Sequence, residues 1–569
     1  MKVLGQNHIS QQRVSEYLWE YRYFFSILCI GLVYFFNLFI DIMDIDAAQY
    51  ASISREMMES GSYLQVFEQG KDYLDKPPLL FWISSLSLKI FGVHNFAYKL
   101  PAVLIIILGL YSTFRFTLLW YNKRTAWYSV IILGTTQAFY LITNDIRTDG
   151  ILTSFIIFAV WQLFRFLKDR KISGLILGAV GASCALMAKG PIGLVIIAFA
   201  VGGDLLIKLQ LKKILDYRWL VFIFIIAVLL FPMCYGLYTQ FDLHPEKTAY
   251  GISNPSGLKF FFWTQSFGRI TGESSWKNDT SFFTFFHTIL WDFQPWVFLM
   301  LAMIFYKIKN LVGSFKLHEK YKKVEYASLF GFILPFLALS LSSYKLPHYI
   351  FPTFPFMAIM VADFINALSD KKWAKRLAQI QFGISHSFFL VPFVAFGFFF
   401  SLQNNFILPT LLVLLYLLFW RSFEKIKDVA DKIIFSTLIA IWGFGLVTST
   451  YFYPNLLQFQ ASSIAAKEIV KEPNLPPQKL YAFNAYESSL SFYAQQIISE
   501  FKIDQTHSYP AGIFVFSDEE GKDKLLKYSE YELIKSYVDY NITALSLPFL
   551  LKKTRNDHLE NRFLLKKIR

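Results

Sequence analysis

Long apolar runs separated by short polar segments dominate the chain. The first run, FFSILCIGLVYFFNLFI, ends at Ile40, and three aspartates follow within six residues, Asp41, Asp44 and Asp46. Because a membrane-spanning helix needs about 20 mostly apolar residues, the pattern predicts thirteen spans, of which one or two short ones could be merged or re-entrant. They lie near residues 22–40, 99–120, 126–142, 150–167, 173–188, 192–207, 219–238, 285–306, 326–341, 349–367, 380–401, 406–420 and 433–451.

The composition supports a membrane protein. Of the 569 residues 55% are hydrophobic and only 17% charged, and the mean hydropathy is +0.40. Such a chain is too apolar for an ordinary soluble protein and long enough for many spans plus an extra domain. Its three cysteines all lie in apolar runs, which predicts neither a disulfide framework nor a metal cluster. No short apolar core with a cleavage site precedes residues 22–40, so we expect this run to be a retained first span.

The basic residues predict the orientation. The net charge of +14 could suit a nucleic-acid partner, but the positive-inside rule explains it better, and we expect no nucleic-acid partner. Alternate loops between the spans are basic, namely 121–125, 167–171, 208–218, 306–324, 369–376 and 421–432. Placing these loops in the cytoplasm predicts a multi-pass protein of the plasma (inner) membrane with a cytoplasmic N-terminus. Residues 41–98, 239–284 and 455–569 then lie outside.

The character of the chain changes near residue 455. The segments KLYAFN, GIFVFS and YELIKSY have strand patterns, and SSLSFYAQQII has a helix pattern. Short strands between helices predict a small α/β domain. The expected organisation is therefore a transmembrane domain, 1–454, followed by an extracytoplasmic (periplasmic) α/β domain, 455–569.

Unusual polar residues gather on the predicted outer side. Charged side chains near a bilayer are costly and usually face a cavity or one another. Carboxylates and cations collected on one face therefore predict a site for a phosphate-bearing substrate at the outer membrane surface. These residues are Asp44, Asp46, Asp75, Lys76, Asp145, Arg147, Asp149, Lys189, Arg269, Glu273, Lys277, Asp279, Lys345, His348 and Tyr349.

Each of these positions also has a purely structural interpretation. Asp46 and Gln49 have capping-box spacing, so Asp46 could cap the next helix, a role that can coexist with catalysis. Arg55 and Glu59 are spaced i,i+4, which predicts a surface ion pair. Lys76 could be a snorkelling lysine, and Lys189 could be a topology signal. Arg147 and Asp149 could form an ion pair at a span end, and His348 could be an interfacial histidine.

The segment after Asp46 has a helical pattern of its own. Tyr50, Ile53 and Met57 share one helical face, and the other face is polar. This pattern predicts an amphipathic helix lying in the membrane interface. Such a helix would hold Asp46 at the depth of a lipid headgroup.

These stretches resemble the bacterial members of the dolichyl-phosphate-mannose protein mannosyltransferase superfamily, above all the aminoarabinose transferases that modify lipid A. The ordered motifs extend over about 300 residues. The family's D-x-x-x-Y-A pattern is met by Asp46, Tyr50 and Ala51, and R-E-M follows at 55–57. Further matches are D-K-P-P at 75–78, R-T-D at 147–149, K-G-P at 189–191, and K-L-x-x-Y from Lys345 to Tyr349.

The resemblance implies a GT-C fold, an α-helical polytopic membrane protein of about 13 transmembrane helices with a small C-terminal extracytoplasmic α/β domain. It implies transfer of a sugar, a pentose or a hexose, from a polyprenyl (undecaprenyl) phosphate to lipid A or a related acceptor. A secreted-protein acceptor, as in protein O-glycosylation, is the alternative within the family. Membrane lipids are the other expected partners.

The resemblance also implies roles for residues. The aspartate matching Asp46 is the family's catalytic carboxylate, and the one matching Asp149 supports the same site. The residues matching Lys76 and Tyr349 are associated with the lipid phosphate. We expect Lys345, Arg147 and Lys189 to assist in donor binding, and assign acceptor-binding or supporting roles to Asp44, Tyr50, Arg269, Glu273 and His348.

Two positions depart from the family pattern. Gln49 stands where many relatives carry an arginine, so one phosphate-binding cation is lost or replaced. Asn278 stands where relatives tend to have a histidine, 17 residues before the Pro295-Trp296 pair. Some aminoarabinose transferases bind a metal through that histidine and the carboxylate matching Asp75. A divalent metal at Asp75 therefore stays open but is disfavoured, and no cofactor is certain.

Two functions of other classes also fit a polytopic chain. A transporter or flippase of a lipid-linked sugar would usually place its substrate near the bilayer midplane and show repeat symmetry. The charges in this sequence lie at span ends and no repeat is visible, which favours an enzyme. A non-catalytic receptor or scaffold would leave the ordered motifs unexplained.

Overall fold

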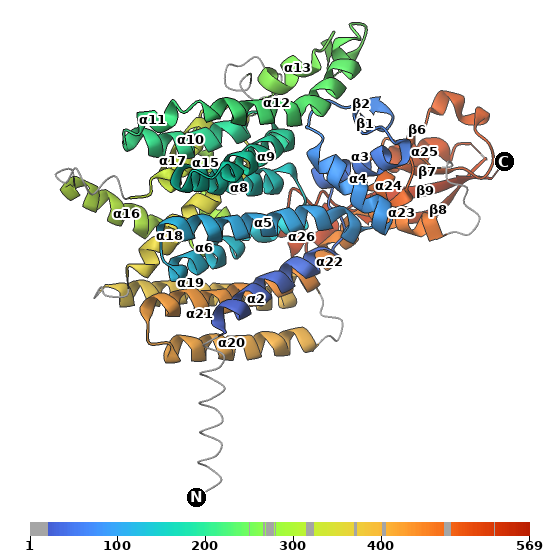
Figure 1. Cartoon of the computed structure of the whole chain (residues 1–569). Helices are drawn as coiled ribbons and strands as arrows, with labels where there is room; N and C mark the ends of the chain where they lie inside the picture. The colour runs from blue at the N-terminus through green and yellow to red at the C-terminus, as the bar shows by residue number, and fades with distance from the viewer. Residues whose placement is uncertain are drawn as a thin grey trace, which may run out of the picture.

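The protein is a bundle of long helices with a small sheet at one end (Figure 1). The computed structural model describes residues 21–249, 251–265, 268, 278, 280–314, 324–368, 373–400, 406–471, 480–528 and 530–568. In Figure 1 the long helices run across the view, and the strands of residues 480–567 lie together on the right. Helix α3 lies at that same end of the bundle.

In the first half of the chain, two shorter helices, α3 and α4, lie between α2 and α5. Two antiparallel hairpins of two-residue strands also occur: β1 pairs with β2 between α3 and α4, and β3 pairs with β4 between α12 and α13. The bounds are α2 Arg22–Asn37, α3 Asp46–Ser60, β1 Phe67–Glu68, β2 Lys71–Asp72, α4 Leu79–Phe91, α5 Asn95–Trp120, α6 Lys123–Gly134, α7 Gln137–Asn144, α8 Thr148–Asp169, α9 Ile172–Lys189, α10 Ile192–Ile207, α11 Leu211–Ile214, α12 Arg218–Leu237, β3 Thr248–Ala249, β4 Ile252–Ser253 and α13 Gly257–Lys259.

The second half continues the bundle and ends in the sheet region. Its helices and turns are α15 Thr284–Asp292, α16 Val297–Ser314, α17 Ala327–Ser340, the 3-10 turn η4 Pro347–Thr353, α18 Phe354–Asn366, α19 Ala374–Val394, α20 Ile407–Lys425, α21 Val429–Val447, α22 Tyr453–Leu456, α23 Ala461–Lys471, α24 Ser488–Ala494, α25 Glu519–Leu525 and α26 Leu547–Leu550.

Eight helical stretches of the described residues are long and apolar enough to cross a membrane. Five shorter apolar helices accompany them, including α4 in the predicted outer loop 41–98. The predicted span 126–142 is divided into α6 and α7, because the Thr136 side chain accepts a hydrogen bond from the Phe139 N–H and starts a new helix. The predicted span 285–306 is divided into α15 and α16. The count of thirteen spans stays a prediction.

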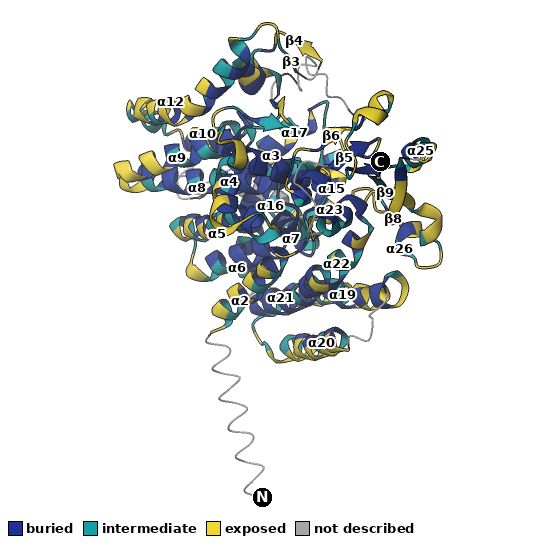
Figure 2. Cartoon of the chain, turned by 90° about the vertical axis from the view of Figure 1, so that its right-hand side faces the viewer, coloured by how far each residue is buried: buried dark blue, intermediate teal, exposed yellow. Residues whose placement is uncertain are grey.

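Burial separates the inside of the bundle from its outer faces (Figure 2). The outer faces of α12 and α20 expose apolar side chains such as Phe224 and Leu414. By contrast, 83% of the residues in the most apolar 18-residue stretch of α8 are buried. Apolar outer faces around a buried interior are what a helical bundle presents to lipid.

Close packing holds α8 and α9 against each other. A Cβ atom added at Gly174 of α9 would lie 2.7 Å from the Gln162 carbonyl oxygen of α8. Small residues at such contacts let two helices approach closely in a membrane. The pair therefore forms a rigid unit, and this unit carries Asp149 near the start of α8 and Lys189 at the end of α9.

The last part of the chain forms a five-stranded mixed sheet in the order β6-β5-β7-β9-β8. Strand β5 is parallel to β6 and β7, whereas β9 is antiparallel to β7 and β8. The three predicted strands are β5, β7 and β8, and the predicted helix is α24, while β6 and β9 were not predicted. The strands span Leu480–Phe483 (β5), Ser499–Glu500 (β6), Phe514–Ser517 (β7), Tyr531–Asp539 (β8) and Glu560–Lys567 (β9).

The predicted helix is α3, but its polar face packs on protein, because α24 lies against it. That α3 lies in the membrane interface stays a prediction. The Ser52 hydroxyl donates to the Ser488 carbonyl at 2.8 Å, and Glu56 is buried as well. Arg55 does pair with Glu59 at 2.5 Å, but its side chain is fully buried, so the predicted surface pair is wrong. Its guanidinium donates to Ser491 and to the Gln496 carbonyl. The polar face of α3 is thus a protein contact.

Candidate active site

An arginine joins two segments that are distant in the sequence, at the end of the bundle where α3 lies. Arg147 immediately precedes α8, and its Nη1 lies 2.5 Å from Oδ2 of Asp46 at the start of α3. Its Nε donates to Asp145 at 2.7 Å. Helix α3 begins without a side-chain cap, since Ile45 is its N-cap residue, so the capping box of Asp46 and Gln49 is not formed. Asp46 is instead oriented by Arg147, as a substrate-facing carboxylate would need to be.

A second ion pair lies at the neighbouring helix ends. Asp149, in the first turn of α8, pairs with Lys189 at the end of α9. The other oxygen of Asp149 lies 3.7 Å from Nε2 of His348 in η4. The Lys189 ammonium also lies 3.9 Å from the centre of the Tyr349 ring. Residues of α8, α9 and η4 therefore meet at one place.

The two aspartates differ in accessibility. The side chain of Asp46 is 37% exposed, whereas that of Asp149 is 2% exposed. A carboxylate that exchanges a proton with a substrate must be within reach of it. Asp46 meets that condition, and Asp149 is placed to orient Lys189 and His348.

Tyr50 and the Asp75–Lys76 pair complete the cluster. Lys76 Nζ lies 2.6 Å from Asp75 Oδ2. Burial raises the pKa of Tyr50 well above its ordinary value, and the negative charges of Asp46 and Asp75 raise it further. The Lys76 ammonium also lies close enough to the His348 ring for the two groups to interact electrostatically. These electrostatic contacts place Asp75 and Lys76 beside the two ion pairs, with Tyr50 as a buried, protonated hydroxyl.

Charges within the cluster are nearly balanced. Each of its three cations already contacts a carboxylate, so a substrate phosphate would have to share or exchange those contacts. The cations are Lys76, Arg147 and Lys189, and the carboxylates are Asp46, Asp75, Asp145 and Asp149.

Two predicted site residues make their contacts elsewhere. Asp44 is buried against the C-terminal segment, where the Ser489 N–H and hydroxyl both donate to it. The Lys345 ammonium donates to the Ser342 carbonyl at 2.6 Å, and burial lowers its pKa. Arg269 and Glu273 lie outside the described residues, as do Lys277 and Asp279.

Glu68 is a polar neighbour that the sequence analysis missed. The Gln49 side-chain amide donates to Glu68 at 2.8 Å, and burial raises the pKa of Glu68. A glutamine–glutamate pair therefore stands where many relatives place an arginine. No spacing pattern connects the β1–β2 hairpin with α3, so the sequence offers no signal for this contact.

The described residues do not fit a divalent metal at Asp75. Its carboxylate contacts the Lys76 ammonium, and the Gln265 side-chain amide donates to the Asp75 carbonyl. The side chain of Asn278, at the position of the metal-binding histidine, instead donates to the Lys345 carbonyl and accepts from the Lys345 N–H. Within the described part of the chain, no group of three or more histidine, cysteine or acidic residues is arranged to hold a metal.

Comparison with known proteins agrees with the motif pattern. Residues 75–235 match the family model described as dolichyl-phosphate-mannose-protein mannosyltransferase. An uncharacterized protein of Aquifex aeolicus is 26% identical over 482 residues, which cover 84% of this chain and 87% of that protein. An undecaprenyl phosphate-alpha-4-amino-4-deoxy-L-arabinose arabinosyl transferase of Shewanella sediminis is 24% identical over 365 residues, 62% of this chain and 61% of that enzyme.

The fold is that of a solved aminoarabinose transferase. The crystal structure of ArnT from Cupriavidus metallidurans bound to undecaprenyl phosphate superimposes with a TM-score of 0.72 at 16% identity, covering 90% of this chain and 95% of that one. The apo structure of the same protein gives 0.71 over 97% and 98%. The resemblance to GT-C glycosyltransferases of the aminoarabinose-transferase type is therefore confirmed, and the chain has the fold of a multi-pass GT-C membrane protein.

Proposed function

We propose that this GT-C chain transfers a sugar from a polyprenyl phosphate to lipid A or a related acceptor at the outer face of the plasma membrane. The observation that carries the proposal is the half-exposed Asp46 carboxylate, held by Arg147 beside the Asp149–Lys189 pair. The similarity to undecaprenyl phosphate aminoarabinose transferases supports the donor class. The transferred sugar, pentose or hexose, is part of what the experiment below must identify.

The cations of the cluster suit a phosphate leaving group. As the bond from the anomeric carbon to the phosphate oxygen breaks, negative charge grows on the lipid phosphate. Fixed cations that hold this charge in the transition state usually contribute the largest share of catalysis. Lys76 is our first choice, with Lys189, Arg147 and the Tyr349 hydroxyl assisting. The phosphate would share these cations with Asp75 and Asp149.

Asp46 is assigned the role of the general base. If the acceptor is a hydroxyl, Asp46 removes its proton as the acceptor oxygen attacks the anomeric carbon, and such a base contributes about 10²- to 10⁴-fold. If the acceptor is a phosphate of lipid A, no proton need be removed, and Asp46 orients the acceptor instead. Direct displacement inverts the anomeric configuration in either case.

The test compares wild type with Asp46→Asn in membranes supplied with radiolabelled polyprenyl-phosphate sugars. Asp41→Asn is the matched control, because Asp41 pairs with Lys467 and lies outside the cluster. We expect transfer by wild type and by Asp41→Asn, and a loss of at least about 100-fold in Asp46→Asn. Separate counting of lipid and protein fractions identifies the acceptor class.

Three outcomes would overturn parts of the proposal. Equal transfer by wild type and Asp46→Asn would remove Asp46 from the chemistry. A product with retained configuration would exclude direct displacement. Movement of the lipid-linked sugar across the bilayer with no transfer to any acceptor would favour a transporter.

A further inference from the structure

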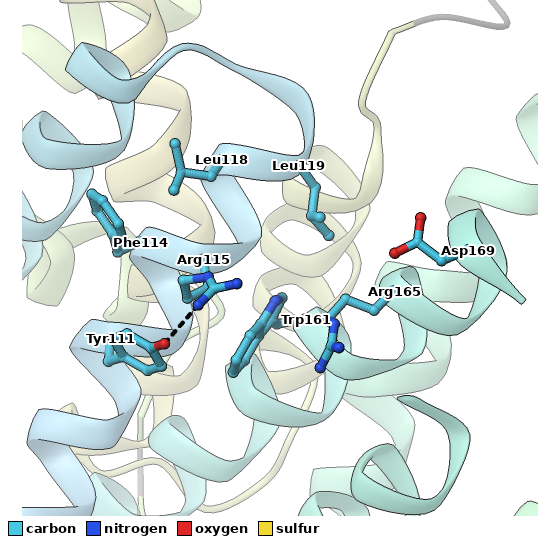
Figure 3. A pocket seen from close by; sticks show the side chains of 8 residues that line it. All are labelled: Tyr111, Phe114, Arg115, Leu118, Leu119, Trp161, Arg165 and Asp169. Atoms are coloured by element: carbon cyan, nitrogen blue, oxygen red, sulfur yellow. Dashed lines mark hydrogen bonds between the residues drawn. The ribbon is translucent and has the colours of Figure 1, made fainter. Parts of the chain in front are cut away.

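A cavity of about 470 Å³ lies between α5 and α8, far from the candidate active site. Arg165 follows Arg147 by 18 residues along α8, so at 1.5 Å per residue the two lie about 27 Å apart. That distance is close to the thickness of the hydrocarbon core, about 30 Å. The cavity therefore belongs to the opposite membrane surface. Its lining is Tyr111, Phe114, Arg115, Leu118, Leu119, Trp161, Arg165 and Asp169 (Figure 3).

Two arginines flank a buried tryptophan in this cavity. The guanidinium carbons of Arg115 and Arg165 lie 5.3 Å and 5.7 Å from the centre of the Trp161 ring, and Figure 3 shows the indole between them. Arg115 donates to the Tyr111 hydroxyl at 2.7 Å, and Arg165 donates to the Gln162 side chain at 2.8 Å. Each arginine thus has a neutral hydrogen-bond acceptor.

Neither charge is balanced locally. Within the described part of the chain, no carboxylate forms an ion pair with Arg115 or Arg165, although Asp169 lines the same cavity. The cations of the candidate active site, in contrast, all contact carboxylates. Trp161 is only 6% exposed, and its indole N–H has no hydrogen-bond partner among the described residues. The guanidinium groups of Arg115 and Arg165 line the cavity, so an anion that enters it can reach both.

The surroundings identify a lipid. Helix α5 exposes apolar residues along its length, including Leu104, Ile107 and Leu118. The basic loops 121–125 and 167–171 adjoin the cavity end of both helices. By the positive-inside rule this end faces the cytoplasm, where anionic lipids are concentrated. An anionic lipid would suit both parts of the site, because its phosphate could contact the arginines while its acyl chains pack on the apolar face of α5.

We propose that this cavity binds the headgroup phosphate of an anionic glycerophospholipid of the cytoplasmic leaflet. The planar guanidinium groups of Arg115 and Arg165 donate to the phosphate oxygens, a geometry that arginine favours over lysine. The Trp161 ring lies between the two arginines and supports their orientation. The acyl chains lie along the exposed face of α5. This inference does not depend on the proposed sugar transfer.

Native mass spectrometry of the purified full-length chain tests the proposal by titration with phosphatidylglycerol, phosphatidylcholine and soluble glycerol phosphate. We expect wild type to prefer phosphatidylglycerol. Each hydrogen bond from an arginine to the charged phosphate contributes about tenfold in affinity, so Arg115→Gln with Arg165→Gln should weaken phosphatidylglycerol binding by roughly 100-fold. The matched control is Lys171→Gln with Lys212→Gln, which removes the same charge from exposed residues at the same end and should bind as wild type does.

Further variants keep the proposal testable if the double glutamine variant does not fold. Arg115→Gln and Arg165→Gln as single variants should each lower the affinity about tenfold, the effect of one hydrogen bond to a charged group. Equal binding of phosphatidylglycerol and phosphatidylcholine by wild type would overturn the proposal. So would glycerol phosphate binding as tightly as the lipid, or an unchanged affinity in the arginine variants.

Discussion

At the scale of single residues, Asp46 and Asp149 show how the same type of side chain can lie in two different environments. Both are the acidic residue of a helix first turn, where the helix dipole stabilises a negative charge. Asp46 is held by one arginine and faces solvent, whereas Asp149 is enclosed by Lys189 and His348. Accessibility thus separates a carboxylate suited to chemistry from one suited to positioning.

Asp149→Asn should lower both stability and transfer. The substitution leaves the partly buried Lys189 ammonium without its anionic partner, at a cost of about 1–3 kcal/mol. Asp46→Asn, at an exposed position, should change stability by less than about 1 kcal/mol while still abolishing transfer. Thermal unfolding of the two purified variants beside wild type measures the difference. Equal thermal stability of the two variants would contradict the distinction.

Asp44 should make stability depend on pH. Burial, and next the charge of Glu487, raise the pKa of the folded Asp44 carboxyl from 3.8 to about 8. Between these values the folded chain holds a proton that the unfolded chain has released, so stability falls as pH rises from about 4 to about 8 and levels off above. Thermal unfolding of wild type from pH 5 to pH 9 should show this decline.

Asp44→Asn is uncharged at every pH and should flatten the decline in this range. Asp41→Asn is the control, since Asp41 lies three residues earlier and pairs with Lys467. The control should keep the slope of wild type. A slope that persists in Asp44→Asn would assign the pH dependence to another group.

At the scale of elements, the site depends on how helices pack. Helix α9 presents Lys189 to Asp149 only because α8 and α9 approach closely along their length. Helix α3 presents Asp46 because α24 covers its polar face, and Arg55 anchors that contact from a fully buried position. The packing of α9 on α8 and of α24 on α3 therefore sets where the candidate site residues lie.

Gly174→Ala tests the first of these contacts. The new Cβ would meet the backbone of α8 at 2.7 Å, so the two helices must separate, and such overpacking costs about 1–3 kcal/mol. Gly202→Ala is the matched control, because nothing lies within 4 Å of its Cβ position in α10. The control should equal or exceed wild type in thermal stability, since alanine is the better helix former. Equal thermal stability of the two variants would show that α8 and α9 can separate at this contact without destabilising the protein.

At the scale of the whole molecule, the two ends of the bundle carry different chemistry. One end holds the acidic and basic cluster and the C-terminal sheet, and the other carries the basic loops 121–125 and 167–171 and the cavity of Arg115 and Arg165. The C-terminal region contacts the core of the bundle through α24 and α26, since Phe492 and Phe549 belong to the main hydrophobic cluster, whereas the strands form two hydrophobic clusters of their own. The division at residue 455 into two domains stays a prediction.

The predicted orientation can be tested with introduced cysteines. Lys171→Cys and Glu519→Cys both place a thiol at an exposed position, one in a basic loop and one on α25. A membrane-impermeant maleimide applied from the periplasmic side should label only Glu519→Cys, and permeabilised cells should label both. Labelling of only Lys171→Cys before permeabilisation would reverse the orientation.

The helical membrane class, the positions of most helices, three of the five C-terminal strands and the ordered motifs could all be predicted from the amino-acid sequence. These features follow from apolar run length, periodicity and local motif spacing, which are properties of neighbouring residues. Four other features became visible only in the packed molecule: Arg147 holds Asp46, Lys345 and Asp44 bond elsewhere, Gln49 meets Glu68, and the polar face of α3 is buried. Each of these contacts joins segments far apart in the chain, and no local pattern records which polar groups must satisfy one another once the helices pack.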